Sequence, residues 1–239
     1  MRYKRRMDVE IWSDVVCPWC YIGKRRFERA LAEFDHRGEV SVTWRSFQLD
    51  PNAAATSEGD PIDRLAAKYG MSRATAEAAQ ARVTANAATA GLDFHLDRAR
   101  SGNTFDAHRL IHYAKSVGNQ DMLKERLMAA YFIEGAAIGE HEALARLAVE
   151  VGLDEPAVRE VLDGDAYADD VRHDELEARE LGITGVPFFV LDRAYGVSGA
   201  QPSETMLAAL QQAWTAAHPL QMVGAGDTDT TCTDESCAV

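Results

Sequence analysis

Hydrophobic and polar positions alternate in two short segments near the start of the chain. Residues 9–16, VEIWSDVV, are rich in β-branched and aromatic side chains, and residues 39–47, EVSVTWRSF, alternate apolar and polar positions. Between these two predicted strands, apolar residues recur at near-helical spacing, and Gly38 is a candidate helix stop. The strand–helix–strand order predicts a βαβ unit and therefore a parallel sheet.

The pattern becomes helical from Pro51 to about Leu181. Asp60 before Pro61, and Ser72 before an alanine-rich stretch, are typical helix starts. Two later segments carry apolar stripes at the i, i+3, i+4, i+7 spacing of buried helix faces: Ala107, Leu110, Ile111, Ala114 and Val117, then Leu144, Leu147, Ala148 and Val151. The sequence therefore predicts an all-helical block between two mixed segments.

A β-hairpin and a closing helix are predicted after this block. Residues 186–191 form an apolar run, Asp192 and Arg193 a turn, and residues 195–198 a second short strand. The final residues, GAGDTDTTCTDESCAV, include four acids and no base, and few of them are apolar. This composition predicts a mobile tail.

Composition narrows the class of protein. With 239 residues, 46% of them hydrophobic, the chain is long enough to form a sizeable core. A net charge of −13 argues against nucleic acid as a partner, and no apolar run reaches the roughly 18 residues that a membrane span needs. The basic start, MRYKRR, is not followed by the apolar region of a signal peptide. We therefore expect a cytoplasmic protein, with Met7 as an alternative start to Met1.

Two of the four cysteines, Cys17 and Cys20, form a CPWC motif directly before the first predicted helix. The start of a helix offers unpaired N–H groups and the positive end of the helix dipole, and both favour a thiolate. Cys17 is therefore the predicted nucleophile. Cys20, one turn further on, is predicted to be the more buried, resolving thiol, and Pro18 fits the first helical turn.

A structural zinc site is the main alternative for these cysteines. Cys17, Cys20, Cys232 and Cys237 would supply four thiolate ligands. Zinc-binding pairs usually lie on turns, however, whereas Pro18 and the apolar residues after it indicate the start of a helix. We therefore expect no metal, and an inert pair is disfavoured because Cys-X-X-Cys in a βαβ unit is a redox signature.

The second informative motif is GVPFFV, about 170 residues later. Pro187 stands at the start of an apolar strand, where it cannot donate a hydrogen bond to the sheet, so it belongs at an edge or a bend. A cis bond between Val186 and Pro187 would suit this position, although an ordinary trans proline is commoner.

The motifs SDVVCPWC and GITGVPFF, with weaker support from NTFDAHRL, resemble the thioredoxin superfamily. The fold implied is an α/β thioredoxin fold with a large inserted all-helical domain. More narrowly, the chain resembles the DsbA family and, within it, the FrnE-like dithiol–disulfide isomerases and oxidoreductases. The resemblance implies that Cys17 and Cys20 are the exchanging pair and that Pro187 is a cis-proline beside them, with Val186 before it.

The resemblance covers roughly residues 8–217 and suggests how the chain is divided. Residues 8–50 and 182–218 are the expected halves of the thioredoxin-like domain, 51–181 the inserted helical domain and 219–239 a tail. Expected partners are protein or small-molecule disulfides and dithiols, together with a cellular thiol reductant. No cofactor is expected, and the oligomeric state is left open.

Trp19 distinguishes this chain from the strongly oxidising periplasmic members, which resemble one another in carrying Pro-His between the cysteines. Trp19 offers no charge to stabilise the thiolate, so a less oxidising couple is expected. We expect Trp19 and the backbone of Val186 to contact an extended substrate. Kappa-class glutathione transferases and 2-hydroxychromene-2-carboxylate isomerases resemble this fold but carry Ser at the position of Cys17. The alternative enzyme function is therefore that of a glutathione-dependent transferase or isomerase acting on a small molecule. A second alternative is a non-enzymatic holdase, which binds unfolded chains.

Several further residues are weaker candidates. Asp14 could accept the Cys20 proton through a water or cap the following helix. Phe105, His108 and His112 share one helix face that could line a groove between the domains. The tail cysteines, Cys232 and Cys237, are either a second redox pair on a tether, exchanging with Cys17, or inert.

Overall fold

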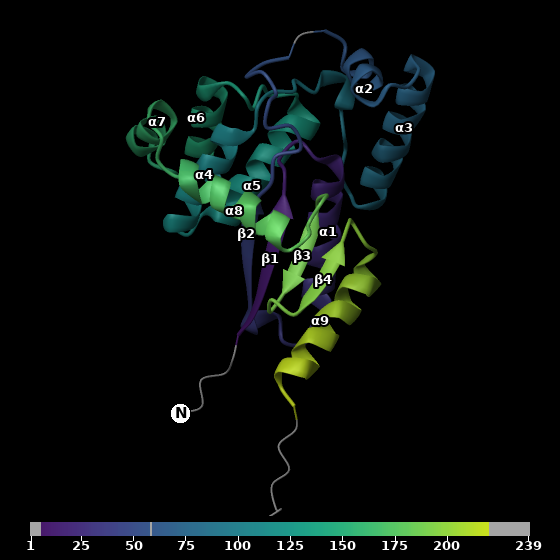
Figure 1. The fold of residues 1–239 in the computed structure, drawn as a ribbon, viewed down its shortest axis with the longest axis vertical. Coiled ribbons are helices and arrows are strands. Elements are labelled where there is room, and N and C mark those ends of the chain that lie inside the picture. Colours follow the sequence, from purple (N-terminus) through teal and green to yellow (C-terminus); the bar gives the residue numbers. More distant parts are fainter. Residues whose placement is uncertain (1–5, 58, 220–239) are drawn as a thin grey trace, which may run out of the picture.

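A four-stranded sheet forms the centre of the computed structural model, which describes residues 6–57 and 59–219 (Figure 1). The strand order is β2-β1-β3-β4. The strands are β1 Met7–Ser13, β2 Val40–Ser46, β3 Phe188–Leu191 and β4 Tyr195–Ser198. β1 is parallel to β2 and antiparallel to β3, and β4 is antiparallel to β3. The predicted parallel βαβ unit is confirmed.

Helices follow in the order that the sequence predicts. Within the described residues, one helix precedes β2, seven lie between β2 and β3, and one follows β4. Their bounds are α1 Pro18–Glu33, α2 Pro61–Tyr69, α3 Arg73–Thr89, α4 Phe105–Ser116, α5 Gln120–Ala129, α6 His141–Glu150, α7 Glu155–Asp163, α8 Ala168–Glu180 and α9 Ser203–Ala217. Short turns of helix are η1 Arg37–Glu39, η2 Leu96–Arg98 and the π-helical η3 Ala130–Glu134. None of the helices in the described part of the chain is long and apolar enough to cross a membrane.

Helices cover both faces of the sheet. Successive strand residues point to opposite sides, so both faces contribute side chains to the core. On one face the rings of Phe27 in α1 and Phe189 in β3 are 5.5 Å apart, and α9 packs beside α1 (Figure 1). On the other face Trp12 is fully buried, and its indole N–H donates to the Asp174 carbonyl oxygen of α8 at 2.9 Å. Residues between β2 and β3 therefore complete the core of the sheet.

Arg45 of β2 ties α8 to the sheet. Its guanidinium donates to Asp174 Oδ1 and to Glu10 Oε1, each at 2.8 Å. Asp174 Oδ2 also accepts from the Ser46 N–H at 2.8 Å. These bonds satisfy polar groups that would be costly to bury alone.

The predicted hairpin is present, and its turn has the expected chemistry. Asp192 and Arg193 adopt φ values of +48° and +56°. Two successive left-handed residues make the kind of tight turn that matches the twist of a hairpin. Asp192 Oδ1 accepts from the Asp8 N–H at 2.8 Å, which fixes the turn to β1.

Helix starts are predicted better than helix ends. Asp60 and Ser72 cap α2 and α3 as expected, accepting from the N–H groups of Ile62 and Thr75. In contrast, α1 ends at Glu33, well before the predicted stop at Gly38. Gly38 instead lies in η1. Val117 is 53% exposed rather than buried, because α4 ends one residue earlier.

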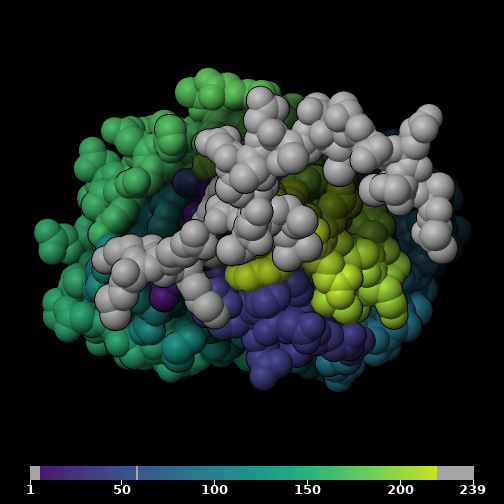
Figure 2. Space-filling model, turned by 90° about the horizontal axis from the view of Figure 1, so that it is seen from below, coloured from purple at the N-terminus to yellow at the C-terminus, as the bar shows by residue number. Residues whose placement is uncertain are grey.

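The last described helix ends far from the start of α1. Near the end of α9, the Trp214 ring lies 5.9 Å from the ring of Phe34, which follows α1. It also stacks on His36 at 4.1 Å. Figure 2 views this end of the molecule, with α9 in yellow against the violet-blue residues that follow α1. Cys17, at the start of α1, therefore lies at the other end of this helix from the contact with Trp214.

Helix α1 lies close to Pro187, just before β3, at Gly23. A Cβ at this position would lie 2.9 Å from Pro187 Cγ and 3.5 Å from the Phe189 ring. A side chain here would therefore displace Pro187 or α1.

Replacing Gly23 by Ala is expected to lower the free energy of unfolding by about 1–3 kcal/mol, because the added methyl group overpacks this contact. Gly38→Ala is the matched control, since a Cβ at Gly38 meets nothing within 4 Å. Chemical denaturation measures both variants. Equal stability of the two would contradict the close packing of α1 on Pro187.

Candidate active site

Cys17 and Cys20 form a close pair of thiols at the start of α1. Cys17 is the N-cap residue, with extended backbone angles of φ −85° and ψ 112°, and Pro18 is the first residue of the helix. Both cysteines are free and buried, Cys17 being 4% and Cys20 1% exposed. Cys20 is thus the more buried thiol, as the sequence predicts, although the difference is small.

The second predicted motif lies directly against Cys17. The Cys17 Sγ–H donates to the carbonyl oxygen of Val186 at 3.5 Å, across 169 residues of chain. The Val186–Pro187 peptide bond is cis, as the sequence predicts. Val186 is half-buried and Pro187 is buried. The fold therefore brings the two motifs singled out in the sequence into one site.

The pKa of the Cys17 thiol is raised well above its ordinary value. Its interaction with the Cys20 side chain is the largest cause, burial is the next, and the charge of Asp14 adds to them. The Cys20 backbone N–H lowers the pKa, but by less. The expectation of a favoured thiolate is therefore wrong for Cys17 in the dithiol. That expectation considered the position at the helix start. It considered neither the burial of the thiol nor its coupled titration with the adjacent thiol.

Asp14, three residues before Cys17, is buried with both carboxylate oxygens engaged. Oδ2 accepts from the Leu49 N–H at 2.8 Å, and Oδ1 lies 3.3 Å from His108 Nε2. Burial tends to raise the pKa of Asp14, but the hydrogen bond and charge of His108 prevail and lower it. The interpretation of Asp14 as a helix cap is wrong, since no side chain caps α1. Its role as a proton acceptor stays a prediction.

The two histidines of α4 do not line a groove. His108 is 1% and His112 7% exposed. His112 Nε2 lies 3.0 Å from both Ser46 Oγ and Asp174 Oδ2. Burial is the largest influence on His108 and lowers its pKa, even though Asp14 opposes the shift. Both side chains therefore belong to the buried polar contacts between the sheet and the helices.

Lys124 of α5 is a site residue that sequence reasoning missed. Its side chain is 0% exposed, and its Nζ donates to the Ser13 carbonyl oxygen at 3.1 Å. The available signal was helical periodicity. Lys124 occupies the same helix face as Gln120 and Leu127, which are both buried, so its spacing is that of a core position.

Trp19 is the exposed member of the CPWC motif. Its side chain is 36% exposed, and Leu49, whose N–H donates to Asp14 Oδ2, is 43% exposed. Apolar surface therefore adjoins the buried thiols.

Residues 6–57 and 59–219 contain no group of three or more His, Cys, Asp or Glu side chains that could hold a metal ion. The zinc alternative also requires Cys232 and Cys237. Those two residues lie outside the part of the chain that the structure describes.

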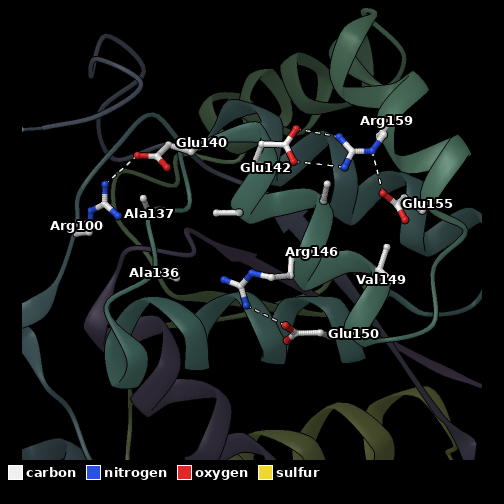
Figure 3. A pocket seen from close by; sticks show the side chains of 12 residues that line it. Arg100, Ala136, Ala137, Glu140, Glu142, Arg146, Val149, Glu150, Glu155 and Arg159 are labelled. Atoms are coloured by element: carbon white, nitrogen blue, oxygen red, sulfur yellow. Dashed lines mark hydrogen bonds and ion pairs between the residues drawn. The ribbon is translucent and has the colours of Figure 1, made fainter.

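A hollow of about 670 Å³ in the helical block has no cysteine in its lining (Figure 3). Its arginines already face glutamates: Arg159 pairs with Glu142, and Arg146 with Glu150, each at 2.9 Å. These guanidinium groups are therefore not available as unpaired cations. The hollow is not part of the candidate active site.

Comparison with solved structures identifies a similar protein over the whole chain. The crystal structure of probable DsbA oxidoreductase SCO1869 from Streptomyces coelicolor is 49% identical, with a TM-score of 0.85. The match covers 98% of this chain and 99% of that one. The cytosolic disulfide reductase DsbM from Pseudomonas aeruginosa is 16% identical, with a TM-score of 0.62, over 87% of this chain and 99% of its own. This second likeness shows a shared fold alone.

Sequence comparison agrees with the structural match. The uncharacterized protein YwbO of Bacillus subtilis (strain 168) is 30% identical over 185 residues, which is 77% of this chain and 86% of that protein. The family model described as DSBA-like thioredoxin domain matches residues 8–211. With its close pair of thiols at the start of α1, this chain belongs to the DsbA-like thioredoxin domain family of thiol oxidoreductases.

Proposed function

We propose that this protein is a thiol–disulfide oxidoreductase or isomerase that acts on protein disulfides through Cys17 and Cys20. The observation that carries the proposal is the pair of buried free thiols at the start of α1, with Cys17 Sγ 3.5 Å from the Val186 carbonyl oxygen. Small-molecule disulfides suit the same chemistry. A cellular thiol reductant regenerates the dithiol in the cytoplasm, and the reaction uses no cofactor or metal.

The exchange proceeds in two displacements. Cys17 loses its proton and attacks one sulfur of the substrate disulfide, forming a mixed disulfide and releasing the other sulfur as a thiolate. Cys20 then loses its proton and attacks the Cys17 sulfur, which releases the second substrate sulfur. The substrate gains two electrons and two protons, and Cys17 and Cys20 are left as a disulfide.

The substrate segment binds in an extended form beside Val186. The Val186 carbonyl oxygen lies 3.5 Å from Cys17 Sγ. We expect the substrate chain to approach Cys17 from this side. Trp19, 36% exposed, offers an apolar surface to side chains of the substrate. An extended segment with apolar side chains is therefore the expected substrate form.

We propose that the protein favours reduction or isomerisation of substrate disulfides rather than net oxidation of substrate thiols. A strongly oxidising couple depends on a stabilised thiolate in its reduced form. Here the interaction with Cys20 and burial raise the pKa of Cys17, and Trp19 brings no charge to oppose them. The disulfide form is therefore relatively stable, which makes the dithiol the more reducing species.

We also propose a relay through Cys232 and Cys237, both outside the described residues. The ring contact between Trp214 and Phe34, 5.9 Å, places the end of α9 at the far end of α1 from Cys17. A helix of 16 residues spans about 24 Å. The relay therefore requires the chain after α9 to span a distance comparable with the length of α1.

Replacing Cys20 by Ala is expected to trap a mixed disulfide through Cys17, because the thiol that releases the substrate is gone. Non-reducing gels and mass spectrometry of the adduct measure the trapping. Cys17→Ala is the matched control and should trap none. Adducts through Cys20 in Cys17→Ala, with none in Cys20→Ala, would reverse the assigned roles.

Cys17→Ser is expected to abolish turnover of insulin disulfides by a thiol reductant. This variant separates the proposed function from its alternatives. A holdase would show no such turnover in the wild type. A glutathione-dependent transferase or isomerase of the kappa or 2-hydroxychromene-2-carboxylate type would retain its small-molecule activity with Ser at this position.

Removing residues 224–239 is expected to change the rate of substrate disulfide reduction while leaving the fold and the Cys17–Cys20 pair intact. The control is a full-length chain with Cys232 and Cys237 replaced by Ser, which should match the truncated chain. An unchanged rate, and no crosslink from Cys17 to either tail cysteine by mass spectrometry, would exclude the relay.

A further inference from the structure

An arginine of α1 reaches across to the loop after β4. Arg26 is half-buried, and its Nη1 donates to the Ala200 carbonyl oxygen at 2.6 Å, across 174 residues of chain. The same loop packs on Gly23, one turn earlier in α1, where an added Cβ would lie 3.5 Å from Ala200 Cβ. Residues three apart share a helix face, so Gly23 and Arg26 present one face of α1 to this loop.

The loop after β4 in turn holds the segment that leads into β3. The pairing of the two strands ends where Phe188 lies opposite Ser198. Just beyond that pair, the Gly199 N–H donates to the Pro187 carbonyl oxygen at 2.8 Å. Gly199 has a φ of +78°, in the left-handed region that favours glycine. This bond therefore extends the contact of the hairpin by one step, from the loop to Pro187.

Pro187 follows the residue that contacts the predicted nucleophile. The Val186 carbonyl oxygen lies 3.5 Å from Cys17 Sγ, and its carbon forms the peptide bond to Pro187. The contacts thus lead from Arg26 through the loop after β4 to Val186 and back to Cys17, the N-cap of α1. Because the helix holds Cys17 and Arg26 at a fixed separation, a loop bonded to Arg26 is also fixed relative to Cys17.

The other arginines of α1 bond to different parts of the fold. Arg25 pairs with glutamates of α1 and α5. Arg29, one turn after Arg26, donates to the Thr89 carbonyl oxygen of α3 at 3.3 Å. Within the described residues, Arg26 is the one of these three that donates to the loop after β4. Arg29 therefore offers a matched comparison, since it also bonds a side chain of α1 to a main-chain carbonyl.

We propose that Arg26 is a positioning residue for substrate binding, which holds the Val186–Pro187 segment beside Cys17 before the substrate arrives. This inference rests on the proposed function, in which an extended disulfide segment binds along Val186. A binding segment that is correctly placed for only part of the time weakens the apparent affinity by that fraction. Arg26 therefore contributes to affinity for extended substrates and not to the exchange between sulfur atoms.

The first test compares the steady-state reduction of insulin disulfides by wild type and Arg26→Met. Methionine keeps part of the apolar stem and removes the donor. A segment placed correctly about one fifth of the time raises KM about fivefold, while kcat stays within about twofold. Arg26→Lys, which keeps a cationic donor, is expected to restore most of the loss. Arg29→Met is the matched control and is expected to keep the wild-type KM.

A small disulfide separates positioning from general damage to the thiol site. Hydroxyethyl disulfide has no extended chain to bind along Val186, so Arg26→Met is expected to reduce it at the wild-type rate. Three results would overturn the proposal: an unchanged KM for insulin in Arg26→Met, the same rise of KM in Arg29→Met, or an equal loss of activity toward the small disulfide.

The second test does not depend on enzymatic activity. Amide hydrogen exchange, followed by NMR, reports whether the Gly199 N–H keeps its bond to Pro187. In Arg26→Met this amide is expected to exchange about tenfold faster than in wild type. The control is the amide of Asp192 at the other end of the hairpin, which donates to the Asp8 carbonyl oxygen at 2.8 Å and is expected to exchange as in wild type.

Wild-type exchange at Gly199 in Arg26→Met, or an equal acceleration at Asp192, would overturn the proposal. Arg26→Gln, with a shorter side chain, is the second variant if Arg26→Met fails to fold. If the wild type reduces no disulfide, the proposed function itself fails, while exchange at Gly199 still tests the positioning role of Arg26.

Discussion

Antiparallel pairing of β1 with β3 is the constraint on which the active site depends. In this register Trp12, next to the end of β1, lies opposite Phe188, the first residue of β3. The loop that leaves β1 toward Cys17 therefore meets the segment that enters β3 through Pro187. Two motifs far apart in the chain become neighbours because their strands are neighbours, and the contact of Cys17 Sγ with the Val186 carbonyl oxygen follows.

The helical block contributes to the chemistry of this site as well as to the core. It supplies His108, which binds Asp14, and Lys124, which donates to the Ser13 carbonyl oxygen. It also supplies Asp174, through which α8 is tied to Arg45 of β2. Both thiols are buried, and burial is one of the causes that raise the pKa of Cys17.

Much of the fold could be predicted from the sequence, because local patterns determine it. Alternation predicted β2, and capping residues predicted the starts of α2 and α3. Pro18 and the apolar residues after it predicted that Cys17 lies at a helix start. The end of α1 at Glu33 could not be predicted, since the chain leaves the helix without a glycine. The electrostatics of the site also depend on tertiary contacts. The pattern shows that Lys124 is on a core-facing position, but not which groups it faces.

The most direct test of the account is the redox equilibrium of the protein with glutathione, read by alkylation and mass spectrometry. The account predicts a two-electron transition in which Cys17 and Cys20 become joined, with the loss of two hydrogen atoms. It also predicts that this transition lies toward the reducing side. Stable glutathione adducts without a Cys17–Cys20 bond, or thiols that remain free in oxidised buffer, would contradict it.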